Sequence, residues 1–367
     1  MHRINRRNVL AALPALAVGA TTSSVAAQPV VRGAPLMAFA YVGTVGKFGW
    51  NYAHERARRH IAAEFRRSIE TTSFENVPEG LAAIPYFRRM IESGAQSIVA
   101  TTYGFRDAVL KLASEFPSVR FEHCTGLESR SNVHLYAAKT WESAFLAGAL
   151  AAEATRSGVL GVLGSVPIPE VIRCINAFTL GAKRLAPDIE VRLRWVEAWW
   201  DPELESANTA ALVRDGADCI FPTTNSDQPL LTASKLKARA FGVDSDMSEI
   251  GGRAHLASAV IDWTPYYRTV ARDLTAASQE SQPVYWGLET GTVDLAGIAS
   301  DVRSASRAKI ASLKERLITG QDSVWEGPIR SRDGRYVAEE GQRLSAHQVE
   351  QMNWLVAGVT GLLPIGR

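Results

Sequence analysis

The glycine-rich segment "GTVGKFGWNYAHE", residues 43–55, is the first stretch whose residue types and spacing could do chemistry. A dinucleotide-binding fingerprint requires G-x-G-x-x-G after a strand, but the three glycines here have the spacing G-x-x-G-x-x-G. The pair His54-Glu55 begins the zinc-protease motif H-E-x-x-H, but an arginine stands where the second histidine ligand is needed. The segment therefore predicts neither a nucleotide cofactor nor a zinc-dependent hydrolase.

Other reactive residue types are equally sparse. No nucleophile elbow G-x-S-x-G occurs, and the three cysteines, Cys124, Cys174 and Cys219, form no C-x-x-C pair. An odd number of cysteines leaves at least one thiol unpaired, and we expect all three to be buried as small apolar side chains. The "DSD" at 244–246 could suggest a metal site, but Asp244 alone, facing a cleft, could accept hydrogen bonds from a bound solute. We therefore predict no catalytic residue, no metal and no cofactor.

Aromatic residues gather at or just after the ends of the expected strands. In an α/β sheet these ends face the ligand cleft, where aromatic rings can stack on a flat ligand or fill a domain interface. Trp199 and Trp200 are adjacent and would point opposite ways along a strand, so only one of them should face the ligand. The six aromatic residues are Trp50, Tyr103, Phe105, Trp199, Trp200 and Trp263.

Regular alternation of strands and helices must position these residues. Short apolar runs predict strands, and apolar side chains spaced as in Ala57, Ile61 and Phe65 predict a helix packed on a sheet. Such alternation is typical of α/β folds with parallel sheets. The expected strands are 36–42, 97–102, 119–126, 159–165, 191–198, 218–224, 239–246 and 256–263, and the expected helices include 141–155, 170–185, 203–215, 228–236 and 265–278.

The strands are too many for one small sheet, and a length of 367 residues suggests two domains. We assign residues 35–140 plus 263–290 to a first lobe and residues 141–262 plus 291–367 to a second. The chain then crosses between the lobes three times. Within the second lobe, Asp333-Gly334 predicts a hairpin turn.

Two further expectations concern helix ends. Residues 345–357 are expected to form a closing helix. Pro169 either makes a rigid cleft wall or stands at the first position of a helix, and in the second case Glu170 and Arg173 would be surface charges.

The N-terminal residues 1–27 predict an export signal. They have a basic start, an apolar stretch too short to span a bilayer, and small residues at Val25 and Ala27 that fit cleavage after Ala27. Arg6-Arg7 fits either the twin-arginine route or an ordinary signal that carries two arginines. The formal net charge of +2 does not indicate a nucleic-acid or anionic-membrane partner.

Several segments, in order along the chain, resemble the basic membrane protein (BMP, PnrA-like) family of substrate-binding proteins of ABC transporters. Each segment is modest alone, and together they cover most of the chain after the export signal. They are "YVGTVGKFGWNYAHE", "ENVPEG", "TTYGFRDAVLKLASEFPSVRFEHCTG", "WESAFLAGALAA", "PIPEVIRCINAFTLGAK", "WVEAWWDPELE", "AFGVDSDM" and "HLASAVIDWTPYY".

This resemblance implies a type I periplasmic binding protein, with two Rossmann-like lobes joined by three hinge crossovers that close on a solute. Family members commonly bind purine nucleosides or nucleobases, and some relatives bind riboflavin. The resemblance implies that Trp50 and Trp199 or Trp200 stack on the base, and that Asn51 lies beside it. Asp244 matches the acidic group that takes sugar hydroxyls in nucleoside binders. The resulting ligand-binding set is Phe48, Trp50, Asn51, Tyr103, Phe105, Trp199, Trp200, Asn225, Asp244 and Trp263.

Two departures from the family pattern bear on the ligand. Asn225 stands where related sequences often have Asp, and an amide both donates and accepts hydrogen bonds. Asp262-Trp263 stands near the position where nucleoside-binding members use a lysine against the ribose. A free nucleobase is therefore at least as well supported as a nucleoside.

Several functions remain open from the sequence. We expect an exported, periplasmic and monomeric receptor that delivers a purine base or nucleoside to an ABC permease. The alternatives are a chemosensory receptor for the same ligand class and a binder of a riboflavin-like heterocycle. A nucleoside hydrolase using Asp244, Asp246 and His54 is disfavoured, because no nucleophile or metal motif supports it.

Overall fold

A computed structural model describes residues 33–276 and 282–364. The expected export signal, residues 1–27, lies outside the described residues. From Ala34 onward the chain forms one unit, which contains two large sheets and a small two-stranded one.

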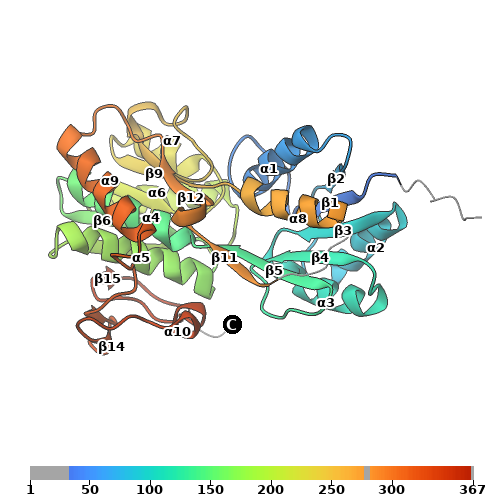
Figure 1. Ribbon diagram of the computed structural model, residues 1–367. Helices are drawn as coiled ribbons and strands as arrows, with labels where there is room; N and C mark the ends of the chain where they lie inside the picture. The colour runs from blue at the N-terminus through green and yellow to red at the C-terminus, as the bar shows by residue number, and fades with distance from the viewer. Residues whose placement is uncertain (1–32, 277–281, 365–367) are drawn as a thin grey trace, which may run out of the picture. The chain divides into compact units, whose positions relative to one another are not determined.

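The first large sheet has six parallel strands in the order β11-β5-β4-β3-β1-β2. Its residues alternate between two apolar layers: Met37 and Phe39 of β1 belong to one core cluster, and Ala38 and Ala40 to another. Helices α1 and α8 pack together in the first layer, and α2 and α3 lie in the second (Figure 1). The bounds are β1 (Leu36–Ala40), α1 (Trp50–Glu64), β2 (Glu70–Phe74), α2 (Ile84–Glu92), β3 (Ala95–Ala100), α3 (Arg106–Glu115), β4 (Arg120–Cys124), β5 (Val133–Ala138), α8 (Thr264–Ala276) and β11 (Val284–Trp286).

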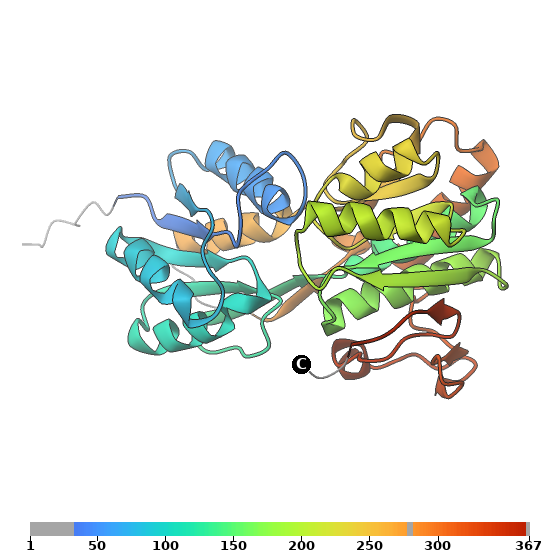
Figure 2. The ribbon, with the colours of Figure 1, turned by 180° about the vertical axis from the view of Figure 1, so that it is seen from behind.

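The second large sheet has seven strands in the order β12-β10-β9-β8-β6-β7-β15. All neighbours are parallel except β12, which runs antiparallel to β10. Helices α6 and α7 pack against each other on one face, and Figure 2 brings them to the front. The bounds are α4 (Thr140–Ala154), β6 (Val159–Gly164), α5 (Pro169–Leu185), β7 (Glu190–Trp195), α6 (Pro202–Arg214), β8 (Cys219–Pro222), α7 (Gln228–Lys235), β9 (Arg239–Asp244), β10 (His255–Ile261), β12 (Val293–Ala296), α9 (Ser304–Ile318) and β15 (Val359–Thr360).

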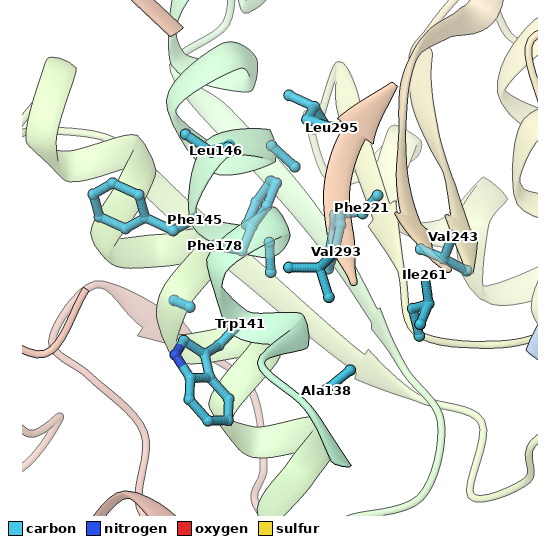
Figure 3. Packing of buried hydrophobic residues seen from close by; sticks show 14 of the residues in the cluster. Ala138, Trp141, Phe145, Leu146, Phe178, Phe221, Val243, Ile261, Val293 and Leu295 are labelled. Atoms are coloured by element: carbon cyan, nitrogen blue, oxygen red, sulfur yellow. The ribbon is translucent and has the colours of Figure 1, made fainter. Parts of the chain in front are cut away.

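Helices α4 and α5 form the tightest helix pair of the second lobe. A Cβ at Gly148 would lie 1.8 Å from the Phe178 carbonyl oxygen, and a Cβ at Gly181 would lie 1.9 Å from that of Phe145. Only glycine at these two positions lets the backbones approach so closely. Phe178 in turn stacks on Phe221 of the sheet, with ring centroids 4.8 Å apart, which fixes α5 against the strands (Figure 3).

The architecture confirms the predicted fold class, two α/β lobes built on parallel-dominated sheets. The chain passes from one sheet to the other after β5, after β10 and after β11, which gives three crossovers. The exact lobe boundaries, at 140/141, 262/263 and 290/291, stay predictions.

The C-terminal segment corrects one expectation. The hairpin around Asp333-Gly334 is confirmed by β13 (Ile329–Arg330) and β14 (Tyr336–Ala338), but the helix expected over 345–357 is only α10 (Ala346–Glu350). Beyond it, Met352, Leu355 and Val356 are buried without helical structure. Asn176 of α5 holds this stretch, because its amide donates to the Trp354 carbonyl at 2.8 Å and accepts from the Val356 N–H at 3.0 Å. The tertiary contact replaces the hydrogen bonds that a longer helix would have made.

Candidate functional site

A cavity of about 100 Å³ lies where strand ends of both sheets meet. A water molecule needs about 10–15 Å³ on the same measure, so the cavity is large enough for several waters or a small solute. Its floor is apolar and comes from the second sheet, through Phe221, Val243, Ala259 and Ile261. Both lobes supply the remaining wall, which is the ligand position expected for α/β sheets.

Five of the ten predicted ligand-binding residues line this cavity. Trp50 and Tyr103 come from the first lobe, and Trp199, Asn225 and Asp244 from the second. They lie at the ends of five different strands or in the loops that follow them, so the sheet topology brings together residues that are far apart in the sequence. Whether they contact a ligand stays a prediction.

Trp50 is fixed at the first position of α1. Its indole N–H donates to the Thr101 carbonyl oxygen at 2.8 Å. Its ring packs edge-on against His54 and Trp263, with centroid distances of 4.9 and 5.7 Å. Trp263 is 1% exposed and stacks on the His54 ring at 4.8 Å, so it supports Trp50 from behind instead of facing the cavity as predicted.

The other four predicted residues also lie away from the cavity wall. Phe105 is fully buried and packs against Phe87, because the turn after β3 points its ring into the first-lobe core. Trp200 is 65% exposed, while its neighbour Trp199 lines the cavity; the pair lies in the loop after β7, not on a strand as expected. The remaining two, Phe48 and Asn51, have local roles: Phe48 packs against the second-lobe cluster that includes Leu230 and Met247, and the Asn51 amide donates to the Thr44 carbonyl.

Two carboxylates face the cavity, and sequence reasoning found only one of them. Asp244 ends β9 with a φ of 62°, a left-handed conformation, and Glu170 stands in the first turn of α5. The expectation that Glu170 and Arg173 would be surface charges is wrong, because Glu170 lines the cavity and Arg173 is 6% exposed, whereas Pro169 does begin the helix. The sequence did contain a signal for Glu170, because a helix that starts directly after β6 must place its first turn at the ligand edge of the sheet.

Neither carboxylate has a hydrogen-bond partner among the described residues. Burial raises the pKa of Asp244 to about 7, and the negative charge of Glu170 adds to this shift. Burial also raises the pKa of Glu170, while the nearby Arg173 opposes the rise. The cavity therefore holds two hydrogen-bond acceptors that this part of the protein leaves unsatisfied.

The cysteine expectation is confirmed for two residues and wrong for the third. Cys124 and Cys219 are buried free thiols, but Cys174 is only half-buried and lines the cavity one turn after Glu170. Burial raises the pKa of the Cys174 thiol to about 12, so it is a neutral group in the cavity wall.

The start of α1 joins the two lobes beside the cavity. The Gly49 N–H donates to Ser245 Oγ at 3.0 Å, and the Trp50 N–H donates to Asn225 Oδ1 at 3.3 Å. The approach is close, because a Cβ on Gly49, whose φ is 82°, would lie 3.1 Å from the Asn225 carbonyl oxygen. Asn225 thus uses its amide oxygen between the lobes, which leaves its NH₂ group as the part able to meet a ligand.

In the part of the chain that the structure describes, no three His, Cys, Asp or Glu side chains gather into a group that could hold a metal ion. Within residues 33–276 and 282–364, no helix combines the length and apolarity needed to cross a membrane.

Two α/β lobes, three crossovers and a partly apolar cavity between strand ends define a solute-binding protein of the type I periplasmic class. The sequence model of the PnrA-like substrate-binding proteins of ABC transporters matches residues 34–324, and the chain belongs to this family. The family consists of transport proteins rather than enzymes: its members bind small molecules, deliver them to permeases and are exported.

Individual relatives support the same class. The chain is 35% identical to a purine-binding protein of Brucella abortus, over 89% of this chain and 93% of that protein. It is 30% identical to a candidate glucose-binding protein of an ABC transporter from Haloferax volcanii, over 89% and 81%. A solved solute-binding protein from Aeropyrum pernix shares the fold, with a TM-score of 0.68 at 15% identity over 81% of this chain and 93% of that one.

Proposed function

We propose that this protein captures a purine base or nucleoside between its lobes and delivers it to an ABC permease. The observation that carries the proposal is the composition of the cavity: a tryptophan from each lobe, an apolar floor and two unpartnered carboxylates. Aromatic rings suit the faces of a flat heterocycle, and carboxylates suit the N–H or O–H groups at its edges. The similarity to a purine-binding protein supports the same ligand class.

The proposal includes a location and an affinity range. We infer a periplasmic, monomeric receptor whose residues 1–27 are removed after export, by the twin-arginine or the general route. Burying both ring faces and satisfying two carboxylates is compatible with a Kd near ~1 μM, which corresponds to about −8 kcal/mol.

Isothermal titration calorimetry of residues 28–367, refolded free of co-purified ligand, tests the proposal. The titrants are adenine, adenosine, guanine, guanosine, hypoxanthine and riboflavin, with glucose included because of the Haloferax relative. We expect micromolar or tighter binding of at least one purine and no turnover. Binding of glucose or riboflavin without any purine would replace the ligand class, and ribose release from a nucleoside would contradict the transport role.

A sugar is the second candidate ligand. Carboxylates without protein partners accept hydrogen bonds from sugar hydroxyls as well as from ring N–H groups, so Glu170 and Asp244 are compatible with both. Trp50→Ala should weaken purine binding by 10-fold or more, because the purine loses a face that an aromatic ring covers.

A further inference from the structure

Residues 325–364, which we call the C-terminal extension, lie beyond the match to the family, which ends at residue 324. The extension has little regular structure: three strands of two or three residues and the five-residue helix α10. Its buried side chains, among them Trp325, Ile329, Val349 and Met352, belong to the apolar cluster that also contains residues of α4 and α5. The extension is therefore packed as an addition to the second lobe.

The extension is attached to the second lobe at several points. Strand β15 adds to the edge of the second sheet by pairing in parallel with β7, which places Val359 opposite Val191. The Trp195 indole N–H, at the end of β7, donates to the Leu362 carbonyl oxygen at 2.7 Å. Together with the bonds of Asn176 described above, these contacts hold the extension along α5, where Figure 1 draws it in red.

Arg173 of α5 connects the extension to the hinge. This side chain is buried, and its Nη1 donates to the carbonyl oxygens of Val349 and Glu350, both at 3.2 Å. Both acceptors belong to the extension, so the backbone of the extension determines where the guanidinium lies. Trp325 adds an aromatic contact, with its ring centroid 6.3 Å from that of Trp141. The extension therefore contacts α4 and α5 near their starts.

Trp141, Arg173 and Tyr285 form one cluster across the crossovers. Trp141 is the second residue of α4 and follows the crossover from β5, while Tyr285 lies on β11, in the first sheet, just before the crossover back. The guanidinium carbon of Arg173 lies 5.3 Å from the Trp141 ring centroid and 5.9 Å from that of Tyr285. The two rings meet edge-on with centroids 5.0 Å apart. The cluster thus joins the second lobe to a strand of the first.

Rotation of one lobe against the other must change this cluster, because Tyr285 moves with the first sheet and Arg173 moves with α5. An arginine side chain in solvent could follow the Tyr285 ring by changing its rotamer. Arg173 is held in place, because any other position would take a buried charge away from the two carbonyl acceptors of the extension. The cation–π contacts are therefore strongest in the arrangement that already fits the held guanidinium.

We propose that the C-terminal extension is a hinge brace: by holding Arg173 against Trp141 and Tyr285, it favours the joined arrangement of the lobes, in which the start of α1 bonds to the second lobe, over more open ones. The inference goes beyond the proposed function, since it concerns the ligand-free protein and not the identity of the solute. A receptor braced in this way opens less often, which slows both the capture and the release of a solute.

Amide hydrogen exchange of the ligand-free protein, residues 28–367, measures how often the lobes part. The Gly49 and Trp50 N–H groups donate to acceptors of the other lobe, so they exchange with solvent when the lobes separate. Val99 and Ile220 lie in the middle of the first and second sheets, where both neighbouring strands pair with them. Their N–H groups exchange only when a lobe unfolds, so they report the stability of each lobe separately.

Arg173→Gln removes the charge that lies over the two rings and keeps an amide that can donate to a carbonyl oxygen. We expect exchange at Gly49 and Trp50 to become faster by about 5- to 30-fold, the range that corresponds to the loss of a desolvated cation–π contact. Arg307→Gln is the matched control, because Arg307 also donates to backbone carbonyls, those of Ile298 and Val302 at 3.1 Å, but only within the second lobe. The control should leave exchange at Gly49 and Trp50 within about 2-fold.

Asn176→Ala tests whether Arg173 depends on the extension. Asn176 bonds to the extension and is not part of the cluster of Trp141, Arg173 and Tyr285. Its loss should loosen the extension and make exchange at Gly49 and Trp50 faster by about 2- to 10-fold, as expected for one or two neutral hydrogen bonds. Thermal unfolding of each variant verifies that it is folded.

The inference fails if Arg173→Gln leaves exchange at Gly49 and Trp50 unchanged, even where exchange at Ile220 becomes faster, because the extension would then stabilise only the second lobe. An equal effect of Arg307→Gln would also contradict it. No effect of Asn176→Ala would assign the cluster to Arg173 alone and refute the role of the extension. These measurements need no ligand, so a failed purine titration would refute the proposed function and leave this inference intact.

Discussion

Buried carboxylates occur both inside the first lobe and in the cleft, and the two regions differ in the hydrogen-bond partners and in the pKa of these groups. In the first lobe, Glu122 is fully buried and accepts hydrogen bonds from Arg120, His134 and Tyr266. Burial alone would raise its pKa, but these partners outweigh burial and lower it. In the cleft, Asp244 has no partner among the described residues, and its pKa rises to about 7.

Other carboxylates follow the same division. Glu55 accepts from Tyr41, Arg58 and Arg59, and although burial acts to raise its pKa, these bonds bring it to about 2. Glu205 of α6 is fully buried and accepts from the Thr224 and Ser226 hydroxyls at 2.7 and 2.6 Å. The carboxylates that hold the fold together are satisfied by the protein, whereas Asp244 in the cleft has no partner among the described residues.

The largest change in stability should come from removing Glu122, the acceptor at the centre of the hydrogen-bond network in the first lobe. Glu122→Ala removes the acceptor of His134 and Tyr266 and leaves the buried Arg120 with Asp273 as its remaining acceptor, and removing one partner of a buried ion pair costs about 3–5 kcal/mol. We expect urea unfolding to show a loss of this size, with unchanged ligand affinity per folded molecule. Glu203→Gln is the control and should change stability by less than about 0.5 kcal/mol, as is usual on the surface. If Glu122→Ala were as stable as the unmodified protein, the division between the two regions would be lost.

Asp244→Asn should stabilise the ligand-free protein against unfolding, which is the opposite of the effect expected for Glu122→Ala. Because the pKa of Asp244 is higher in the folded state, that state binds more protons than the unfolded chain between about pH 4 and 7. The contribution of this group to stability therefore falls as the pH rises through that window. Asn removes the charge, so we expect a gain of roughly 1–3 kcal/mol at pH 8 and little change at pH 4, after allowance for partial solvent access.

Thermal unfolding of the ligand-free variant at several pH values measures this difference. Asp246→Asn is the matched control, since Asp246 is two residues away, exposed and hydrogen-bonded to the Ser248 N–H at 2.9 Å. A pH-independent effect of Asp244→Asn would mean that the unpaired cleft carboxylate is not destabilising, which would contradict the comparison.

The smallest change in free energy should come from removing one hydrogen bond between the two lobes. Ser245→Ala removes the acceptor of the Gly49 N–H, and one neutral hydrogen bond contributes about 0.5–1.5 kcal/mol net. We expect ligand affinity to fall by about 2- to 12-fold, mainly through faster dissociation, with stopped-flow tryptophan fluorescence as the measurement. Asn208→Ala, at an amide that bonds only within the second lobe, should leave the dissociation rate unchanged.

Much of the fold was predictable from the sequence because parallel strands buried on both faces are continuous apolar runs. Segments such as "VLGVLGS" and "AFGVDSD" are runs of this kind. Trp199, Asn225 and Asp244 lie at the edge of the sheet where such strands end, and all three line the cavity. The helix expected over 345–357 was wrong because Asn176, far away in sequence, supplies hydrogen bonds that periodicity does not encode.

The candidate site was less predictable. The presence of an aromatic residue at a strand end does not show whether its ring lines a cavity or packs in a core. Phe105 and Trp263 were therefore included in the predicted ligand-binding set, although both are buried. Glu170 was missed because a proline followed by glutamate starts both α5 and α6, and only the topology shows that one start faces the cleft. Cys174 was misjudged for the same reason, since it lies on the α5 face that carries Glu170.

Gly49, at the start of helix α1, provides no capping side chain. Ser245 and Asn225 of the opposite lobe accept hydrogen bonds from the first N–H groups of the helix instead. When the lobes part, water takes the place of both acceptors, so the two bonds together favour the joined arrangement by only about 1–3 kcal/mol. That is a ratio of roughly 5 to 150 in favour of the joined arrangement from these two bonds alone. We expect a solute that contacts both lobes to favour the same arrangement, so that its binding adds to the preference set by these two bonds.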